Sequence, residues 1–453
     1  MNEFRILSPT AILGYGFPLA SFEKGMEKKP HAIAVDAGSS DPGPYYLGEG
    51  KSFTDYMAVK RDLSVILKGG LQEGIPIIIG SAGGCGANSH LDWCQEILAE
   101  IAKESGLSFT LARIEAEFSY EFLLGQWEAG RISPLAGVPA LTKENLQQAT
   151  RVVGQMGIEP FIEALEKAPD VILAGRAYDP ACFAALPIKL GFDPGLCLHL
   201  GKILECAAIC AVPGSGSDCM LGTVGPDYFE VEPLNGKRRC TPLSVAAHTL
   251  YEKSNPYHLP GPGGSLDLQN CRFEQLGHKV RVQGSKFVPA ATYTVKLEGA
   301  KKIGYRTVSI AGIRDRAMIE KVETVMVGVK DRVADNFGES LGEYFLDFIV
   351  YGKDGVMGNR EPYPTTEGAH ELGIIIEAVG KTQAAADALC SFARSTMLHY
   401  GYEGRRATAG NLAFPYSPSD FHGGAVYEFS VYHLLEVEDG ASSFPIEYME
   451  VGS

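Results

Sequence analysis

The most distinctive charged residue of the chain is Arg176, which follows directly after an apolar run. A guanidinium in such a place is costly unless it is paired. Asp179, three residues later, could be a structural partner. Alternatively, Arg176 could hold a substrate carboxylate through two parallel hydrogen bonds. Each such bond contributes roughly 1.5 to 3 kcal/mol, enough to favour an acid over a neutral analogue by about tenfold or more.

Acid and base chemistry has several candidates. Asp36, Glu205 and Asp218 could each donate or accept a proton, and we favour Glu205 because its apolar neighbours would raise its pKa toward neutrality. Lys202 lies three residues before Glu205 on the same helical face, either as a surface pair or as a buried pair in a cleft. His90 falls in the first turn of a predicted helix, where the imidazolium is disfavoured, so it could act as a neutral base or donor.

Other kinds of site find little support. The hydrolase pattern G-x-S-x-G and the zinc pattern H-E-x-x-H do not occur, and the ten cysteines form no C-x-x-C pair. His248 and Glu252 are spaced as a ligand pair but lack a local third ligand. We therefore predict no metal site, and no cofactor is clearly encoded.

The stretch from Ile75 to Trp93 reads as strand, glycine loop and helix. The apolar run 75–79 fits a strand buried on both faces, and helical spacing begins after Ser89, which could cap the helix with Asp92. A helix N-terminus behind a glycine loop could bind an anion through Ser81, Gly83 and Gly84. Alternatively, the glycines only let a tight turn pack. The spacing matches neither the dinucleotide fingerprint nor the phosphate-binding P-loop.

Two further segments repeat this design. Residues 32–35 and 171–174 are apolar runs that end in polar turns, with strand 109–114 and helix 119–129 between them. Alternating strands and helices predict a parallel sheet whose polar turns meet at one edge. The expected edge combines the residues Asp36, Ser39, Ser81, Gly83, Gly84, Arg176 and Asp179. Beyond it we predict a short strand at 196–200 and a helix at 202–210, and the glycine-rich segment 259–264 looks rigid.

The pattern changes near Pro289. Alternating and helical segments predict the order ββαββαβ, typical of a separate α+β unit with a largely antiparallel sheet. The fold class is therefore α/β, with an α/β domain at 1–288 and a smaller ferredoxin-like α+β domain at 289–453. The predicted elements of this second domain are strands 293–297, 305–310, 344–351, 372–379 and 426–437 and helices 315–329 and 381–400.

Bulk composition limits the partners. The 453 residues carry a net charge of -15, which opposes binding to nucleic acid and to anionic membranes. No apolar stretch approaches the roughly 20 residues of a membrane span, and no signal segment follows Met1. We expect a cytoplasmic protein with reduced cysteines.

Six blocks together resemble the acyclic terpene utilisation protein A (AtuA-like) family, from about Arg5 to Leu435. They are AVDAGSSDPGPYYLG, GSAGG with His90 behind it, ILAGRAYDPACFAALP, HLGKILECAAICA, TPLSVAAHTLYEKSNPY and GNLAFPYSPSD. The resemblance implies catabolism of acyclic terpenes through CoA thioesters, with a lyase step. Some relatives carry a small extra domain or occur beside a small protein, so a small partner subunit is expected. The resemblance supplies no catalytic residues.

These observations favour a lyase that acts on a small carboxylic acid or its CoA thioester, by hydration, dehydration or carbon-carbon cleavage. The anion would lie at the glycine loop and Arg176, while His90, Glu205 or Asp36 moves the proton. A non-catalytic subunit that binds an acid or acyl-CoA within a complex is the alternative. In either case we expect a homo-oligomer or hetero-oligomer.

Overall fold

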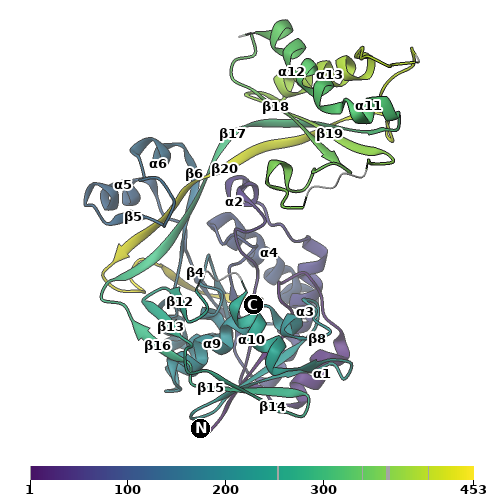
Figure 1. The fold of residues 1–453 in the computed structure, drawn as a ribbon. Coiled ribbons are helices and arrows are strands. Elements are labelled where there is room, and N and C mark those ends of the chain that lie inside the picture. Colours follow the sequence, from purple (N-terminus) through teal and green to yellow (C-terminus); the bar gives the residue numbers. More distant parts are fainter. Residues whose placement is uncertain (1, 252–254, 339, 364–367, 407, 453) are drawn as a thin grey trace. The chain divides into compact units, whose positions relative to one another are not determined.

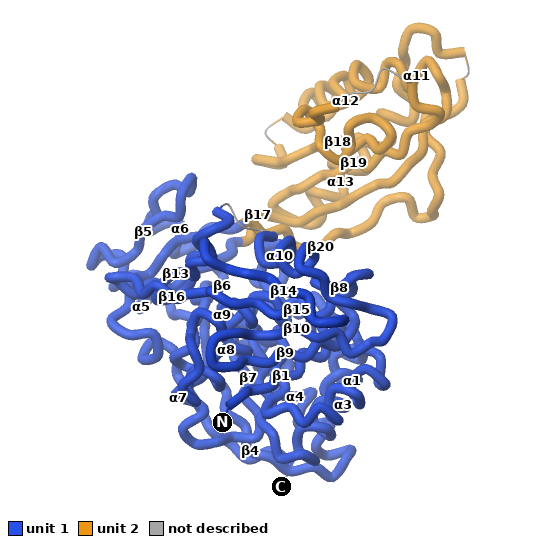
Figure 2. Tube along the Cα trace, turned by 60° about the horizontal axis from the view of Figure 1, so that its bottom comes forward, with its two compact units in different colours: residues 1–301, 429–453 blue, residues 302–428 orange. Residues whose placement is uncertain are grey.

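The computed structural model describes residues 2–251, 255–338, 340–363, 368–406 and 408–452. Residues 302–428 form one compact unit, and residues 1–301 with 429–453 form the other (Figure 2). This division differs from the expected boundary at residue 289. The chain crosses between the units within two long strands, β17 (Tyr293–Ile313) and β20 (Asp420–Val437), and its last strand returns to the first unit.

The larger unit is built on a ten-stranded sheet. Its core is parallel and has the order β1 (Phe4–Ser8), β2 (Ala32–Asp36), β3 (Ile77–Gly80), β7 (Val171–Ala174), β4 (Phe109–Ile114). Antiparallel strands extend both edges: β9 (Met220–Val224), β10 (Phe229–Pro233), β15 (Lys279–Gln283) and β14 (Arg272–Leu276) beyond β1, and β21 (Ile446–Val451) beyond β4. The predicted α/β class is confirmed, with a parallel core inside a mixed sheet.

Helices cover both faces of this sheet (Figure 1). On one face lie α1 (Leu19–Glu27), α3 (Tyr56–Glu73) and α4 (Asn88–Ser105), and on the other α7 (Glu159–Ala164), α8 (Ala181–Lys189) and α9 (Pro194–Leu204). Successive side chains of a strand point to opposite faces. Ile77 and Ile79 therefore join one buried core and Ile78 joins the other, which explains the unbroken apolar run.

One predicted segment is wrong. Residues 196–200 were expected as a strand and 202–210 as a helix, but 194–204 form α9, and only a short 3-10 turn covers Ala207–Cys210. The start of α9 is fixed by Asp193, whose side chain accepts a hydrogen bond from the Leu196 N–H at 2.9 Å, and by Pro194 in the first turn. These capping signals favour a helix more strongly than the alternating leucines of LCLHL favour a strand.

Shorter elements surround the sheet. Strands β12 (His258–Gly261), β13 (Gly264–Asp267) and β16 (Lys286–Pro289) form a small antiparallel sheet. Strand β6 (Ala149–Gln155) pairs with the first part of β17, and β5 (Ile132–Pro134) pairs with β20. The remaining elements are α2 (Pro44–Glu49), α5 (Tyr120–Glu128), α6 (Lys143–Gln148), α10 (Pro242–Leu250), β8 (Ala211–Val212) and β11 (Arg239–Cys240).

The smaller unit has the strand order β18 (Phe345–Tyr351), β19 (Leu372–Gly380), β17, β20, with antiparallel pairing of β19 to both of its neighbours. With α12 (Val322–Phe337) and α13 (Gln383–His399) between them, the strands follow the βαββαβ order typical of ferredoxin-like domains. The largely antiparallel sheet is confirmed. A short helix α11 (Arg316–Glu320) precedes α12, so the predicted helix 315–329 is two helices.

The predicted strands 293–297 and 305–310 are a single strand, β17. Its first part pairs with β6 and its later part with β19, and the register shifts between Ala300 and Lys301. The strand therefore continues while its partner changes.

Across all described residues, no helix combines the length and the hydropathy needed to cross a membrane.

Candidate functional site

The turns after β2, β3 and β7 meet at one edge of the sheet, as expected for the ends of parallel strands. Asp36 lies opposite Gly80 in the register of β2 and β3. The backbone of Ser81 donates to the Gly175 carbonyl at 3.1 Å, and that of Arg176 donates to the Gly86 carbonyl at 3.1 Å. Asp36, Ser81 and Arg176 thus come together although they are far apart in sequence.

The glycine loop serves close packing. A Cβ atom on Gly86 would lie 2.0 Å from the backbone nitrogen of Arg176, and one on Gly84 would lie 2.5 Å from the ring of Phe53. At the N-terminus of α4, the Asn88 N–H donates to the Glu117 carboxylate at 2.8 Å. The protein itself therefore supplies an anion at this helix end. Of the two interpretations of the loop, the geometry favours the packing one.

His90 belongs to the same packed region. Its Nδ1 accepts a hydrogen bond from the Ala87 N–H at 3.2 Å, and its Nε2 lies 3.0 Å from the Lys51 carbonyl, to which it donates. Burial lowers the pKa of His90, which favours the neutral ring. Since both ring nitrogens are engaged by backbone groups, the geometry favours a structural role. His90 also takes the capping place expected for Ser89 and Asp92. A Cβ on Gly83 would lie 2.8 Å from its side chain.

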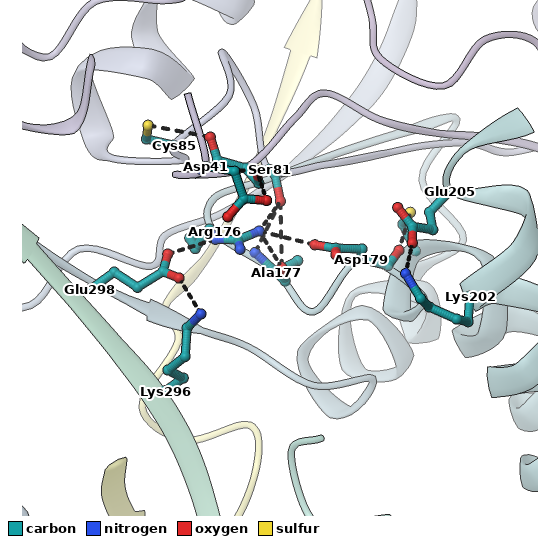
Figure 3. Close-up of polar contacts among 12 residues, drawn as sticks. Asp41, Ser81, Cys85, Arg176, Ala177, Asp179, Lys202, Glu205, Lys296 and Glu298 are labelled. Atoms are coloured by element: carbon teal, nitrogen blue, oxygen red, sulfur yellow. Dashed lines mark hydrogen bonds and ion pairs between the residues drawn. The ribbon is translucent and has the colours of Figure 1, made fainter. Parts of the chain in front are cut away.

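Arg176 is the centre of a buried charge cluster (Figure 3). Its Nε donates to Glu298 at 2.9 Å, and its Nη1 contacts Asp179 at 3.1 Å, the Ser81 hydroxyl at 3.2 Å and the Ala177 carbonyl at 2.9 Å. Burial alone disfavours the guanidinium, but Glu298 and Asp179 hold its pKa well above the usual value. No hydrogen bond joins the remaining nitrogen, Nη2, to another described residue. Arg176 is thus both structurally paired and open at one nitrogen.

Ser81 holds this arrangement in a strained conformation. Its φ of 49° is uncommon for a residue other than glycine. In this position its hydroxyl accepts hydrogen bonds from Arg176 and, at 3.3 Å, from the Ala177 N–H. The strain therefore aims one oxygen at the turn that carries Arg176.

Two site residues were missed by sequence reasoning. Glu298 is fully buried, and its carboxylate contacts Arg176 and also Lys296 at 2.6 Å. Burial alone would raise the pKa of Glu298, but Arg176 and Lys296 lower it to about 2. Lys296 lies 4.6 Å from the ring centroid of Tyr432. The available signal was two charges two residues apart, on one face of the strand and beside the apolar residues Val295 and Leu297.

A second acid lies on the other side of Arg176. Glu205 and Lys202 form a buried ion pair, and Lys202 lies 4.4 Å from the ring centroid of Tyr251. The Cys206 thiol donates to the Glu205 carboxylate at 3.3 Å. Burial raises the pKa of Glu205 to about 7, although Lys202 opposes the shift. The buried alternative is therefore correct for this pair, and so is the predicted rise of the pKa.

Asp36 is a further carboxyl group of the cluster. It is buried, and its Oδ1 makes no hydrogen bond within the described part of the chain. Burial and the nearby Asp179 raise the pKa of Asp36 well above its usual range, and Arg176 only partly offsets this. The cluster therefore holds one carboxyl group suited to donate a proton and another, Glu205, that titrates near neutrality.

The other predicted residues lie elsewhere or bind locally. The Ser39 hydroxyl donates to Asp41 at 2.8 Å within its own turn. Asp218 accepts hydrogen bonds from Arg238 and Asn235, which lower its pKa in spite of burial. Glu252, the suggested partner of His248, lies outside the described residues. Within the described ranges, no group of three histidine, cysteine, aspartate or glutamate side chains is placed to hold a metal.

A surface cavity of about 730 Å³ lies between α1 and α3. Phe22, Met26 and Val65 line it, together with charged side chains of the two helices. None of the predicted site residues lines this cavity, so its size does not make it the candidate site.

Comparison with known proteins gives one family. The model of the family described as "Acyclic terpene utilisation family protein AtuA" matches residues 53–211 and 232–416. These ranges include Ser81, Arg176, Asp179, Glu205 and Glu298. Neither the comparison with curated proteins nor that with solved structures gives a match.

Proposed function

The chain belongs to the acyclic terpene utilisation family, and from this premise we propose that it is a lyase acting on a small carboxylic acid or its CoA thioester. Hydration, dehydration and carbon-carbon cleavage all require proton transfer beside a negatively charged or polarised group. One observation carries the proposal. The buried Arg176 makes no hydrogen bond through Nη2 to another described residue, and its partner Asp179 helps to raise the pKa values of two buried carboxyl groups, Asp36 and Glu205.

We assign roles to these residues from their surroundings. Arg176 binds the anionic group of the substrate through Nη2, while Glu298, Asp179 and Ser81 fix the guanidinium plane. Glu205 accepts a proton, because a base with a pKa of about 7 is half ionised near neutral pH. Asp36 donates a proton, because its acid form is favoured by burial.

The first experiment is a turnover assay. The purified chain, with and without a co-expressed small partner protein, is incubated with unsaturated and hydroxy dicarboxylates and tricarboxylates and with branched acyl-CoA thioesters. We expect loss or gain of water, or cleavage, of at least one of these compounds. Binding without turnover in either preparation would identify the alternative, a non-catalytic acid-binding or acyl-CoA-binding subunit.

The second experiment tests Arg176. Arg176→Lys keeps a positive charge near Glu298 but loses the fork of nitrogens, so affinity for the bound acid should fall at least about tenfold. Arg113→Lys is the matched control, because Arg113 is also largely buried and pairs with Asp92 and Glu115 away from the cluster. Equal affinities of both variants and the unmodified chain would remove Arg176 from the binding site.

A further inference from the structure

Tyr178 lies in the same turn as Arg176 and Asp179, and its hydroxyl has no hydrogen-bond partner among the described residues. The backbone of Tyr178 is fixed at both ends, since its N–H donates to the Met156 carbonyl at 2.8 Å and its own carbonyl accepts from Ala181 at 2.7 Å. Its side chain is 9% exposed. Within the described part of the chain, the hydroxyl oxygen is buried and makes no hydrogen bond.

Such a group is unusual, because buried tyrosine hydroxyls normally find a partner. Tyr293 provides the contrast within this chain, since its hydroxyl donates to the Glu159 carboxylate. An unpaired hydroxyl at Tyr178 weakens the fold unless a ligand completes it. The unpaired hydroxyl therefore indicates a binding site, in which a ligand supplies the hydrogen-bond partner.

The backbone above Tyr178 is shaped to enclose it. The hairpin of β12 and β13 passes over the ring at Gly261, where a Cβ atom would lie 2.8 Å from a ring carbon and 3.2 Å from the hydroxyl oxygen. Any other residue at 261 would push the ring or its hydroxyl aside. This contact gives a purpose to the glycine-rich segment 259–264, which the proposed function had not used.

The charges around Tyr178 keep it a donor. Burial, with the carboxyl groups of Asp179 and Glu205, raises the pKa of Tyr178. The hydroxyl therefore keeps its proton at neutral pH and can donate a hydrogen bond, but cannot serve as a base. Glu205, which acts on the same hydroxyl electrostatically, is the base of the proposed function.

We propose that the Tyr178 hydroxyl donates a hydrogen bond to the carbonyl oxygen of the substrate while Glu205 removes a proton from the carbon next to that carbonyl. This rests on the proposed function and specifies its first step as enolisation. The carbon-hydrogen electron pair becomes the new carbon-carbon π bond, the carbonyl π pair moves to oxygen, and the proton goes to the Glu205 carboxylate. A donor aimed at the developing oxyanion stabilises the transition state more than the bound substrate.

The test is deuterium exchange at the α-carbon of 3-methylbutanoyl-CoA in D₂O, followed by mass spectrometry, with affinity measured by calorimetry. We expect Tyr178→Phe to slow the exchange at saturation by roughly 100-fold or more, the range found when one oxyanion donor is removed. Its affinity for the thioester should change by less than about threefold, because the lost bond acts in the transition state. Its melting temperature should not fall, because no hydrogen bond is lost in the free protein.

Tyr293→Phe is the matched control. It loses the bond to Glu159, so its melting temperature should fall while its exchange rate per folded molecule stays unchanged. Exchange by Tyr178→Phe at the unmodified rate would overturn the inference. Thioester binding without any exchange by the unmodified chain would also overturn it and leave the binding site standing. Absence of thioester binding would remove the acyl-CoA form of the proposed function and this inference with it.

Discussion

Two buried glutamates, each paired with a cation, have very different pKa values. Glu298 and Glu205 are both buried and both paired, yet the pKa of Glu298 is lowered to about 2 and that of Glu205 is raised to about 7. The cause is the number of cations. Glu298 has Arg176 and Lys296, whereas Glu205 has Lys202 alone and also faces the carboxyl group of Asp179. One acid is therefore a fixed charge, and the other is free to exchange a proton.

Removing the fixed charge should destabilise the fold. Glu298→Gln leaves Arg176 and Lys296 without their shared buried partner, a change that costs about 3 to 5 kcal/mol. Urea denaturation of the variant and the unmodified chain measures the loss. Glu320→Gln is the control, since its pair with Arg316 is exposed to solvent and should leave the midpoint unchanged. Equal midpoints for both variants would contradict the assigned role of Glu298.

The raised pKa of Glu205 predicts a pH dependence of stability. Between the ordinary value of 4.5 and about 7, the folded chain binds this proton more tightly than the unfolded chain does. The free energy of unfolding should therefore fall as pH rises through this window, by up to about 1.4 kcal/mol per pH unit. Glu205→Gln cannot titrate, so the unfolding free energy of the unmodified chain relative to this variant should decline over the same window. A difference that is independent of pH would show that the Glu205 pKa is not raised.

The predictability of the site depended on where each residue lies along the chain. Asp36, Ser81 and Arg176 follow apolar runs directly, so the rule that parallel strands end at one edge was enough to place them together. Glu298 is positioned by the pairing of β17 with β6, in which it lies opposite Val153. That register depends on a partner strand more than a hundred residues away, and nothing local to Glu298 specifies it.

At the scale of elements, the correct predictions are those for which the local sequence pattern is clear, and the incorrect ones are those for which it is not. Strands β2, β3 and β7 are buried on both faces, so their composition alone identifies them. For α9, alternation in LCLHL suggested a strand, but every residue from Gly195 to Leu204 is buried, so neither period could appear clearly. The decisive signal was the capping pair Asp193 and Pro194.

The loop between β3 and α4 gives a prediction at this scale. Gly86→Ala should destabilise the protein by several kcal/mol, because the new Cβ would lie 2.0 Å from the backbone nitrogen of Arg176. Gly106→Ala is the matched control, since Gly106 has nearly the same φ, +62° against +65°, but open space around it. The control should cost only about 1 to 2 kcal/mol for the left-handed backbone. Thermal or urea unfolding compares the two, and equal losses would mean that the contact with Arg176 is not tight.

At the scale of the molecule, each unit has its own buried core. The core of the smaller unit combines α12 and α13 with one face of its sheet, and the cores of the larger unit lie on the two faces of the ten-stranded sheet. The described site residues Asp36, Arg176, Glu205 and Glu298 all belong to the larger unit. The chain order did not reveal this division, because β17 and β20 run through both units and β21 pairs with β4, more than three hundred residues earlier.

Separate cores predict separate responses to core mutations. Ile374, in β19, is fully buried in the smaller unit, so Ile374→Ala should lower the stability of that unit by about 2 to 5 kcal/mol. Hydrogen exchange followed by mass spectrometry should then accelerate in peptides from β18, β19 and α13, while peptides from β3 and β7 keep their protection. Ile172→Ala in β7 should give the reverse pattern, because Ile172 packs in a core of the larger unit. If either variant accelerates exchange equally in both units, the two cores unfold as one cooperative body, and a substitution far from Arg176 could no longer be assumed to leave the site intact.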